Sequence, residues 1–408
     1  MKTGTATITL DYGRCPKWLF ERIKTLGGIM AEIIIEEFGT QEFLKRLSHP
    51  VWFQTFGSLL AFDWNSSGLT VVLTAALKEA FRERNLGIYF AGGKGKTSRK
   101  TPDELLFIGE KIGLNGEKYA QISKLTAKVD NSLIQDGFNL YHHSFIITEK
   151  GDWSVVQQGM NTERGLARRY HWLMTQTDAD YTQTNAENIY PNNNRINYPN
   201  KKPNKNIFGP DSGNSLSPRE SLPCRQAGAF SPHRFAFTEE PHSGIASDIF
   251  LKKVLNLTSK ESRENKEGII KVLNEENKII KEMEKILTRS EKNLFLPDIE
   301  FHWHPVVEER FDLKRLTKTV EKARFFKPKT IEELLLIEGV GPKTIRALSL
   351  VSEVIYGAKP SFEDPARYTF AHGGKDGTPY PVDRQTYDET IKIFNKALMI
   401  SKQRKLFT

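Results

Sequence analysis

Residues 331–356 contain two apolar-periodic segments separated by a tight break. The segments read Ile331-Glu332-Glu333-Leu334-Leu335-Leu336-Ile337, then Glu338-Gly339-Val340-Gly341, then Pro342-Lys343-Thr344-Ile345-Arg346 and on to Tyr356. This spacing predicts two helices joined by a short hairpin, with Pro342 at the first position of the second helix. Gly339 and Gly341 are expected to adopt backbone conformations that a side chain would forbid, and Val340 to fill the seam between the helices.

The hairpin has the chemistry of a phosphate-binding loop. The first amides of a helix have no partner within the helix, and they carry the positive end of the helix dipole. Lys343 adds a full positive charge at the same place. The residues predicted to contact a phosphate-bearing ligand here are Gly339, Val340, Gly341, Lys343, Thr344 and Arg346.

The segment Gly339 to Thr344 resembles the hairpin of helix-hairpin-helix DNA-binding proteins. Beyond the second helix, residues 371–383 form a Gly/Pro-rich loop that closes on Asp383. This order is similar to the motif of the endonuclease III superfamily of DNA glycosylases, although the gap between Lys343 and Asp383 is longer than in its compact members. The resemblance implies that Lys343 attacks the sugar and that Asp383 assists release of the base.

The resemblance therefore implies a DNA glycosylase/AP lyase, or a lesion-specific endonuclease, that acts on damaged double-stranded DNA. A lysine that forms a Schiff base must be neutral, so the site must lower the pKa of Lys343 from about 10.4, through burial near Arg346 or Lys375. Tyr380 is the candidate for stacking on an extruded base.

Cofactor requirements follow from the same resemblance and the cysteine count. Many superfamily members hold an iron–sulfur cluster with four cysteines, whereas this chain has two, so that cluster is excluded. No cofactor is required for Schiff-base chemistry. The hairpin is a candidate site for a monovalent cation.

Two other functions fit the same residues. The hairpin can hold DNA without catalysis, with Asp383 as a plain helix N-cap. Alternatively the N-terminal domain is a metal-dependent nuclease, for which the candidate groups are Asp63, Asp130, Asp136, His142 and His143. Because side chains alternate along a strand, His142 and His143 should point to opposite faces. No acidic spacing matches a nuclease signature, and His302-Trp303-His304 lacks a third ligand, so no metal ligand is assigned.

Composition favours a polyanionic partner. The 408 residues carry 59 Lys+Arg against 50 Asp+Glu, a net charge of +9. With 38% apolar residues the chain can bury a core and should form two domains. The two cysteines give no disulfide framework, and no signal core or membrane-spanning run is visible. We expect a cytoplasmic, nucleoid-associated protein with no membrane contact.

The order of elements predicts an α+β protein. Residues 1–177 form a mixed α/β domain, residues 178–236 an Asn/Pro-rich, disordered insertion, and residues 237–408 an all-α domain that carries the hairpin. Helices are expected at 16–39, 41–47, 51–61, 67–84, 117–134, 259–287 and 313–325, and one starting at Thr101 with Glu104 in a capping box. Strands are expected at 5–10, 86–91, 140–147 and 153–158.

A second basic segment lies at residues 92–100. Phe90 stands where a nucleotide-binding P-loop needs glycine, so the segment is not that motif. Its cations still offer a surface for backbone phosphates. The DNA-binding candidates here are Lys94, Lys96, Arg99 and Lys100.

Several dispersed segments give a wider resemblance. They include Arg99-Lys100-Thr101-Pro102, Gln157-Gln158-Gly159-Met160-Asn161, Arg168-Arg169-Tyr170-His171-Trp172 and Glu240-Pro241-His242-Ser243-Gly244-Ile245. Together they resemble a prokaryotic family labelled domain of unknown function 763. The resemblance covers nearly the whole chain except the Asn/Pro-rich insertion, and it implies one integrated protein.

Overall fold

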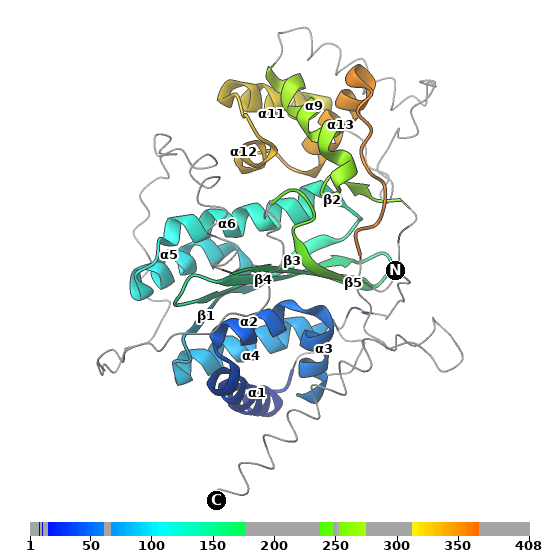
Figure 1. Cartoon of the computed structure of the whole chain (residues 1–408). Helices are drawn as coiled ribbons and strands as arrows, with labels where there is room; N and C mark the ends of the chain where they lie inside the picture. The colour runs from blue at the N-terminus through cyan, green and yellow to red at the C-terminus, as the bar shows by residue number, and fades with distance from the viewer. Residues whose placement is uncertain are drawn as a thin grey trace, which may run out of the picture.

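A five-stranded antiparallel sheet lies at the centre of the protein (Figure 1). The computed structural model describes residues 8, 10, 15–60, 67–175, 237–247, 251, 253–274 and 312–366. The strand order is β1-β3-β4-β5-β6, with β1 (Ile88–Lys94), β3 (Asn139–Thr148), β4 (Trp153–Asn161), β5 (Leu166–Met174) and β6 (His242–Ser247).

Helices cover both faces of this sheet (Figure 1). One face carries α1 (Lys17–Phe38), α2 (Thr40–Ser48), α3 (Pro50–Leu59) and α4 (Gly68–Arg84), and the other carries α5 (Thr101–Ile112) and α6 (Gly116–Lys128). Successive side chains along each strand point to opposite faces of the sheet, so each face contributes to a separate core. Ile146 and Val156 pack with α1–α4, whereas Phe145 and Val155 pack with α6.

The helices that carry the hairpin stack beyond α6 (Figure 1). They are α9 (Arg263–Asn274), α11 (Leu313–Phe326), α12 (Ile331–Leu336) and α13 (Pro342–Tyr356), and α9 follows the short helix η4 (Lys260–Ser262). Leu125 of α6, Val272 of α9 and Leu348 of α13 belong to one continuous apolar cluster. None of the described helices is long and apolar enough to cross a lipid bilayer.

The mixed helix and strand composition confirms the α+β class, but the region from residue 237 is not all-α. Strand β6 pairs with β5, opposing Ser247 to Arg168, and β7 (Leu255–Asn256) pairs with β2 (Ile134–Gln135). The alternating pattern of β5 and β6 is obscured in the sequence because their polar side chains are buried. Arg168, for example, is fully buried and binds both carboxylate oxygens of Asp364 at 2.8 Å.

Two local expectations are corrected around Gly92. Strand β1 does not end at Ala91, since it continues through both glycines to Lys94, which lies opposite His142. Glu104 does not form a capping box with Thr101. Instead its carboxylate accepts hydrogen bonds from the Gly92 amide at 2.7 Å and from the Lys78 ammonium at 2.6 Å.

Most other expected elements agree with the structure where it describes them, but residues 8 and 10, the described part of the strand expected at 5–10, are not in a strand. The four N-terminal helices, the hairpin of β3 and β4, and α11 lie within a few residues of their expected bounds. The helix expected at 117–134 ends earlier, because α6 passes into a π-helical turn, η2 (Val129–Leu133). Only residues 263–274 of the helix expected at 259–287 are described, and the expected insertion at 178–236 lies outside the described residues.

Candidate nucleic-acid interface

The hairpin between α12 and α13 has the expected shape, but its two glycines differ in backbone conformation. Gly339 has a φ of 95°, a conformation that L side chains rarely adopt. Gly341 has a φ of −152°, which is ordinary extended backbone, so the expectation of a forbidden conformation is wrong there. Val340 is 1% exposed and fills the seam between the helices, as predicted.

Gly341 is a glycine beside open space. A Cβ added to it would meet nothing within 4 Å, and no side chain caps the start of α13. The first amides of α13 therefore face a site that a ligand can approach closely. Lys343 is exposed beside these amides, whereas Thr344 and Arg346 are buried.

Two side chains, one at the end of α6 and one in β2, donate hydrogen bonds to the backbone of the hairpin. The Lys128 ammonium donates a hydrogen bond to the Val340 carbonyl, and the Gln135 amide donates one to the Pro342 carbonyl at 2.9 Å. Burial lowers the pKa of Lys128. The monovalent cation at the hairpin stays a prediction.

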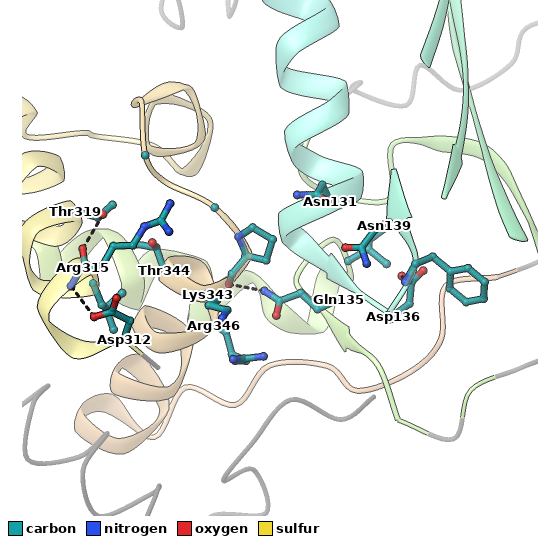
Figure 2. A pocket seen from close by; sticks show the side chains of 17 residues that line it. Asn131, Gln135, Asp136, Asn139, Asp312, Arg315, Thr319, Lys343, Thr344 and Arg346 are labelled. Atoms are coloured by element: carbon teal, nitrogen blue, oxygen red, sulfur yellow. Dashed lines mark hydrogen bonds between the residues drawn. The ribbon is translucent and has the colours of Figure 1, made fainter. Parts of the chain in front are cut away.

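A cavity of about 540 Å³ separates the hairpin from the residues that follow α6. We call it the hairpin pocket. Figure 2 shows Lys343, Thr344 and Arg346 with Arg315 on one side, and Asn131, Gln135 and Asn139 on the other. The remaining lining residues are Ile134, Asp136, Gly137, Phe138, Asp312, Leu316, Thr319, Gly339, Gly341 and Pro342.

The pocket brings together only part of the predicted catalytic site. Lys343 lines it, but the expected burial of this side chain is wrong, since Lys343 is exposed. Asp383 and Tyr380, with Lys375, lie outside the described residues. The joint placement of Lys343 and Asp383 therefore stays a prediction.

The second basic segment lies at the same end of the sheet as the hairpin pocket. Lys94 ends β1 opposite His142, and the Gly95 amide donates a hydrogen bond to the Tyr141 carbonyl at 2.7 Å. Asn139, two residues before Tyr141 on β3, lines the pocket. At about 3.3 Å per strand residue, the basic segment begins on the order of 10 Å from the pocket wall. Lys94, Lys96, Arg99 and Lys100 are all exposed.

The described acidic and imidazole groups proposed for a nuclease are buried and hydrogen-bonded, and Asp130 and His143 share Gln157 as a partner. As predicted, His142 and His143 point to opposite faces, and they contact Thr74 at 3.2 Å and Ser123 at 2.8 Å, respectively. One Asp130 oxygen accepts hydrogen bonds from Gln157 at 2.5 Å and Trp172 at 2.9 Å.

Asp136 is also engaged, by Arg168 at 2.9 Å and Tyr170 at 2.7 Å. Asp63 lies outside the described residues, as do His302 and His304. The described candidates therefore form no solvent-accessible carboxylate cluster.

Four lining residues, from both sides of the pocket, were not predicted from the sequence. Asn131, Gln135 and Asn139 belong to no motif, and Arg315 stands in a helix with several other cations. The contact from Gln135 to Pro342 spans 207 residues, so local spacing carries no signal for it.

The family described as "Protein of unknown function (DUF763)" matches residues 4–205 and 225–382 of the chain. The match leaves out only residues 206–224 of the Asn/Pro-rich region. The chain therefore departs from the family pattern over a shorter stretch than expected. The match ends one residue before Asp383. No curated protein and no solved structure matches the chain.

Proposed function

Because the chain belongs to the DUF763 family, whose description names no activity, we propose from the hairpin geometry that it binds double-stranded DNA and processes a damaged nucleotide. The observation that carries the proposal is the start of α13. Its first amides lie beside Gly341, where an added Cβ would meet no described atom within 4 Å, and Lys343 lines the adjoining cavity. A DNA phosphate is the ligand that the amides at a helix start, a helix dipole and an ammonium group favour together.

The second basic segment enlarges this surface. Lys94 to Lys100 lie at the same end of the sheet as Asn139, so a duplex on the hairpin has further cations within reach along its backbone. Contacts of this kind position a duplex without reading its sequence. They suit an enzyme that surveys DNA of any sequence for damage.

We assign Lys343 as the nucleophile of the chemical step. Its ammonium first gives a proton to solvent, and the neutral amine attacks the anomeric carbon of the damaged nucleotide while the bond from that carbon to the base breaks and the base takes a proton and leaves. The bond from the same carbon to the ring oxygen then breaks, with a proton moving from the nitrogen to that oxygen, and this gives the Schiff base. Loss of a proton from the neighbouring sugar carbon then expels the 3′ phosphate and breaks the strand. By the resemblance to the endonuclease III superfamily, Asp383 stabilises the positive charge that develops on the sugar.

Borohydride trapping tests this step on a duplex that carries one abasic site. Reduction of the Schiff base should join wild-type protein to the DNA covalently, and Lys343→Ala should lose the adduct because the attacking amine is gone. Lys343→Gln, which retains side-chain length, is the matched control and should also lose it. Trapping that is unchanged in both variants would exclude Lys343 as the nucleophile.

The exposure of Lys343 favours a second candidate function, a DNA-binding protein without catalysis. That function predicts affinity for duplex DNA with no cleavage and no trapped adduct on any damaged substrate. Cleavage that EDTA abolishes, with no borohydride adduct, would instead favour the metal-dependent nuclease. Gel assays of the same duplexes with and without EDTA separate the three functions.

A further inference from the structure

The hairpin pocket contains, on β2, a buried acceptor whose hydrogen-bonding capacity is unused. Gln135 is 3% exposed, and its amide nitrogen donates to the Ser132 carbonyl at 3.0 Å and the Pro342 carbonyl at 2.9 Å. Both neighbours can only accept, so the orientation of the amide is fixed. The amide oxygen accepts no hydrogen bond from any described residue.

A buried acceptor without a donor is unfavourable, which makes Gln135 Oε1 a site for an incoming N–H group. Asn131 and Asn139 line the same side of the pocket with further amide groups (Figure 2). The first amides of α13 and the Lys343 ammonium, which favour an anion, line the same pocket, and Gln135 contacts this end of α13 through the Pro342 carbonyl. The ligand thus needs both a negative group and an N–H donor.

The size of the cavity narrows the ligand class. A volume of about 540 Å³ lies within the range of about 300–1,000 Å³ typical of small-molecule sites. A single nucleotide has a phosphate at one end and a planar base with N–H groups at the other. A nucleotide that remains in a duplex has its N–H groups paired, so only an unpaired nucleotide can offer them to Gln135.

We propose that the hairpin pocket accepts one unpaired nucleotide of a DNA strand, with its phosphate on the α13 amides and an N–H of its base donating to Gln135 Oε1. This inference rests on the proposed function, because it takes the hairpin as the DNA-binding element. It adds the base-recognising residue. It also predicts that the pocket distinguishes a nucleotide that has its base from an abasic one, because an abasic nucleotide has no N–H to donate.

Fluorescence anisotropy with the full-length protein and three labelled duplexes tests the proposal. One duplex is fully paired, one carries a single unpaired adenosine, and one carries an unpaired tetrahydrofuran abasic analogue at the same position. An unpaired nucleotide costs little to extrude, so the adenosine duplex should bind about tenfold more tightly than the paired one. The abasic duplex should lose most of that gain.

Two variants connect the preference to the pocket. Asn139→Trp replaces an exposed lining residue by a side chain that fills the cavity, and should abolish the preference for the adenosine duplex over the paired one. Gln135→Leu, checked for folding by circular dichroism, should bind the adenosine and abasic duplexes equally.

Each outcome has a separate meaning. If no duplex binds, the proposed function fails together with this inference. If the paired duplex binds but the adenosine duplex gains nothing, or if Asn139→Trp keeps the gain, only the pocket assignment is overturned. Free dAMP that displaces the adenosine duplex at equal concentration would overturn the DNA strand as the source of the nucleotide.

Discussion

At the scale of single residues, substitutions of Gly339 and Gly341 should separate the stability of the hairpin from the proposed DNA binding. Gly339→Ala places a side chain at a φ of 95°, which should lower the free energy of unfolding by about 1–3 kcal/mol. Gly341→Ala adds a Cβ in open space on extended backbone, so the stability should not change. That Cβ projects where a phosphate would approach, and the loss of one amide–phosphate hydrogen bond, about 1.5–3 kcal/mol, should weaken DNA binding tenfold or more.

Urea denaturation and duplex binding by anisotropy measure the two effects. Each variant is the control for the other, since both add one methyl group to the same turn. Equal affinity of Gly341→Ala and wild type for duplex DNA would mean that the start of α13 does not contact a phosphate.

At the scale of elements, the segment after β1 can be tested apart from the hairpin. Lys96 and Arg99 are exposed on this segment, and Lys17 is an equally exposed cation on α1, across the sheet. If the segment contacts DNA, a Lys96→Ala, Arg99→Ala double variant should reduce the log–log salt dependence of binding by up to about 1.8, or about 0.9 for each phosphate that is no longer neutralised. Lys17→Ala should leave the slope unchanged.

The salt slope is measured by titrating one duplex at several potassium chloride concentrations. The affinity loss should be similar for duplexes of different sequence, because phosphate contacts carry no base information. A double variant with the wild-type slope would confine DNA binding to the hairpin.

The elements themselves differ in how far local sequence specifies them. The helices α12 and α13 were predictable because apolar periodicity, Gly339 and Pro342 act within a few residues. Strand β5 was not predictable, because Arg168, Arg169 and His171 interrupt its alternation of apolar and polar residues. Their burial depends on partners far along the chain. Glu104 shows the same limit, because it binds Gly92 across the structure rather than capping its own helix.

At the scale of the whole molecule, histidines buried between the layers make stability depend on pH. Burial, with His143 and Lys94 nearby, lowers the pKa of His142 from 6.5 to about 3. Between these values the unfolded chain binds a proton at this position and the folded protein does not, so acid favours unfolding. For each pH unit below about 6.5, His142 should lower the free energy of unfolding by about 1.4 kcal/mol. Burial also lowers the pKa of His143 and of His171, which add to the effect.

Urea unfolding at pH 7, 6 and 5 measures this dependence. His142→Gln removes one titrating group and leaves an amide that can contact Thr74, so the fall in unfolding free energy between pH 6.5 and 5 should be smaller by the contribution of one histidine. An identical pH slope in wild type and variant would contradict the neutral state of His142.

The sequence by itself determined the α+β class, most helices, the hairpin and the basic segments, because turn residues, caps and periodicity act locally. Only the tertiary structure decided the sheet order with β6 as its edge, the open face of Gly341 and the hairpin pocket. The walls of that pocket come from segments 207 residues apart, and Gln135 acquires its unpaired oxygen only after folding brings Pro342 to its amide. Long-range contacts of this kind depend on how layers pack, which the spacing within any one segment does not encode.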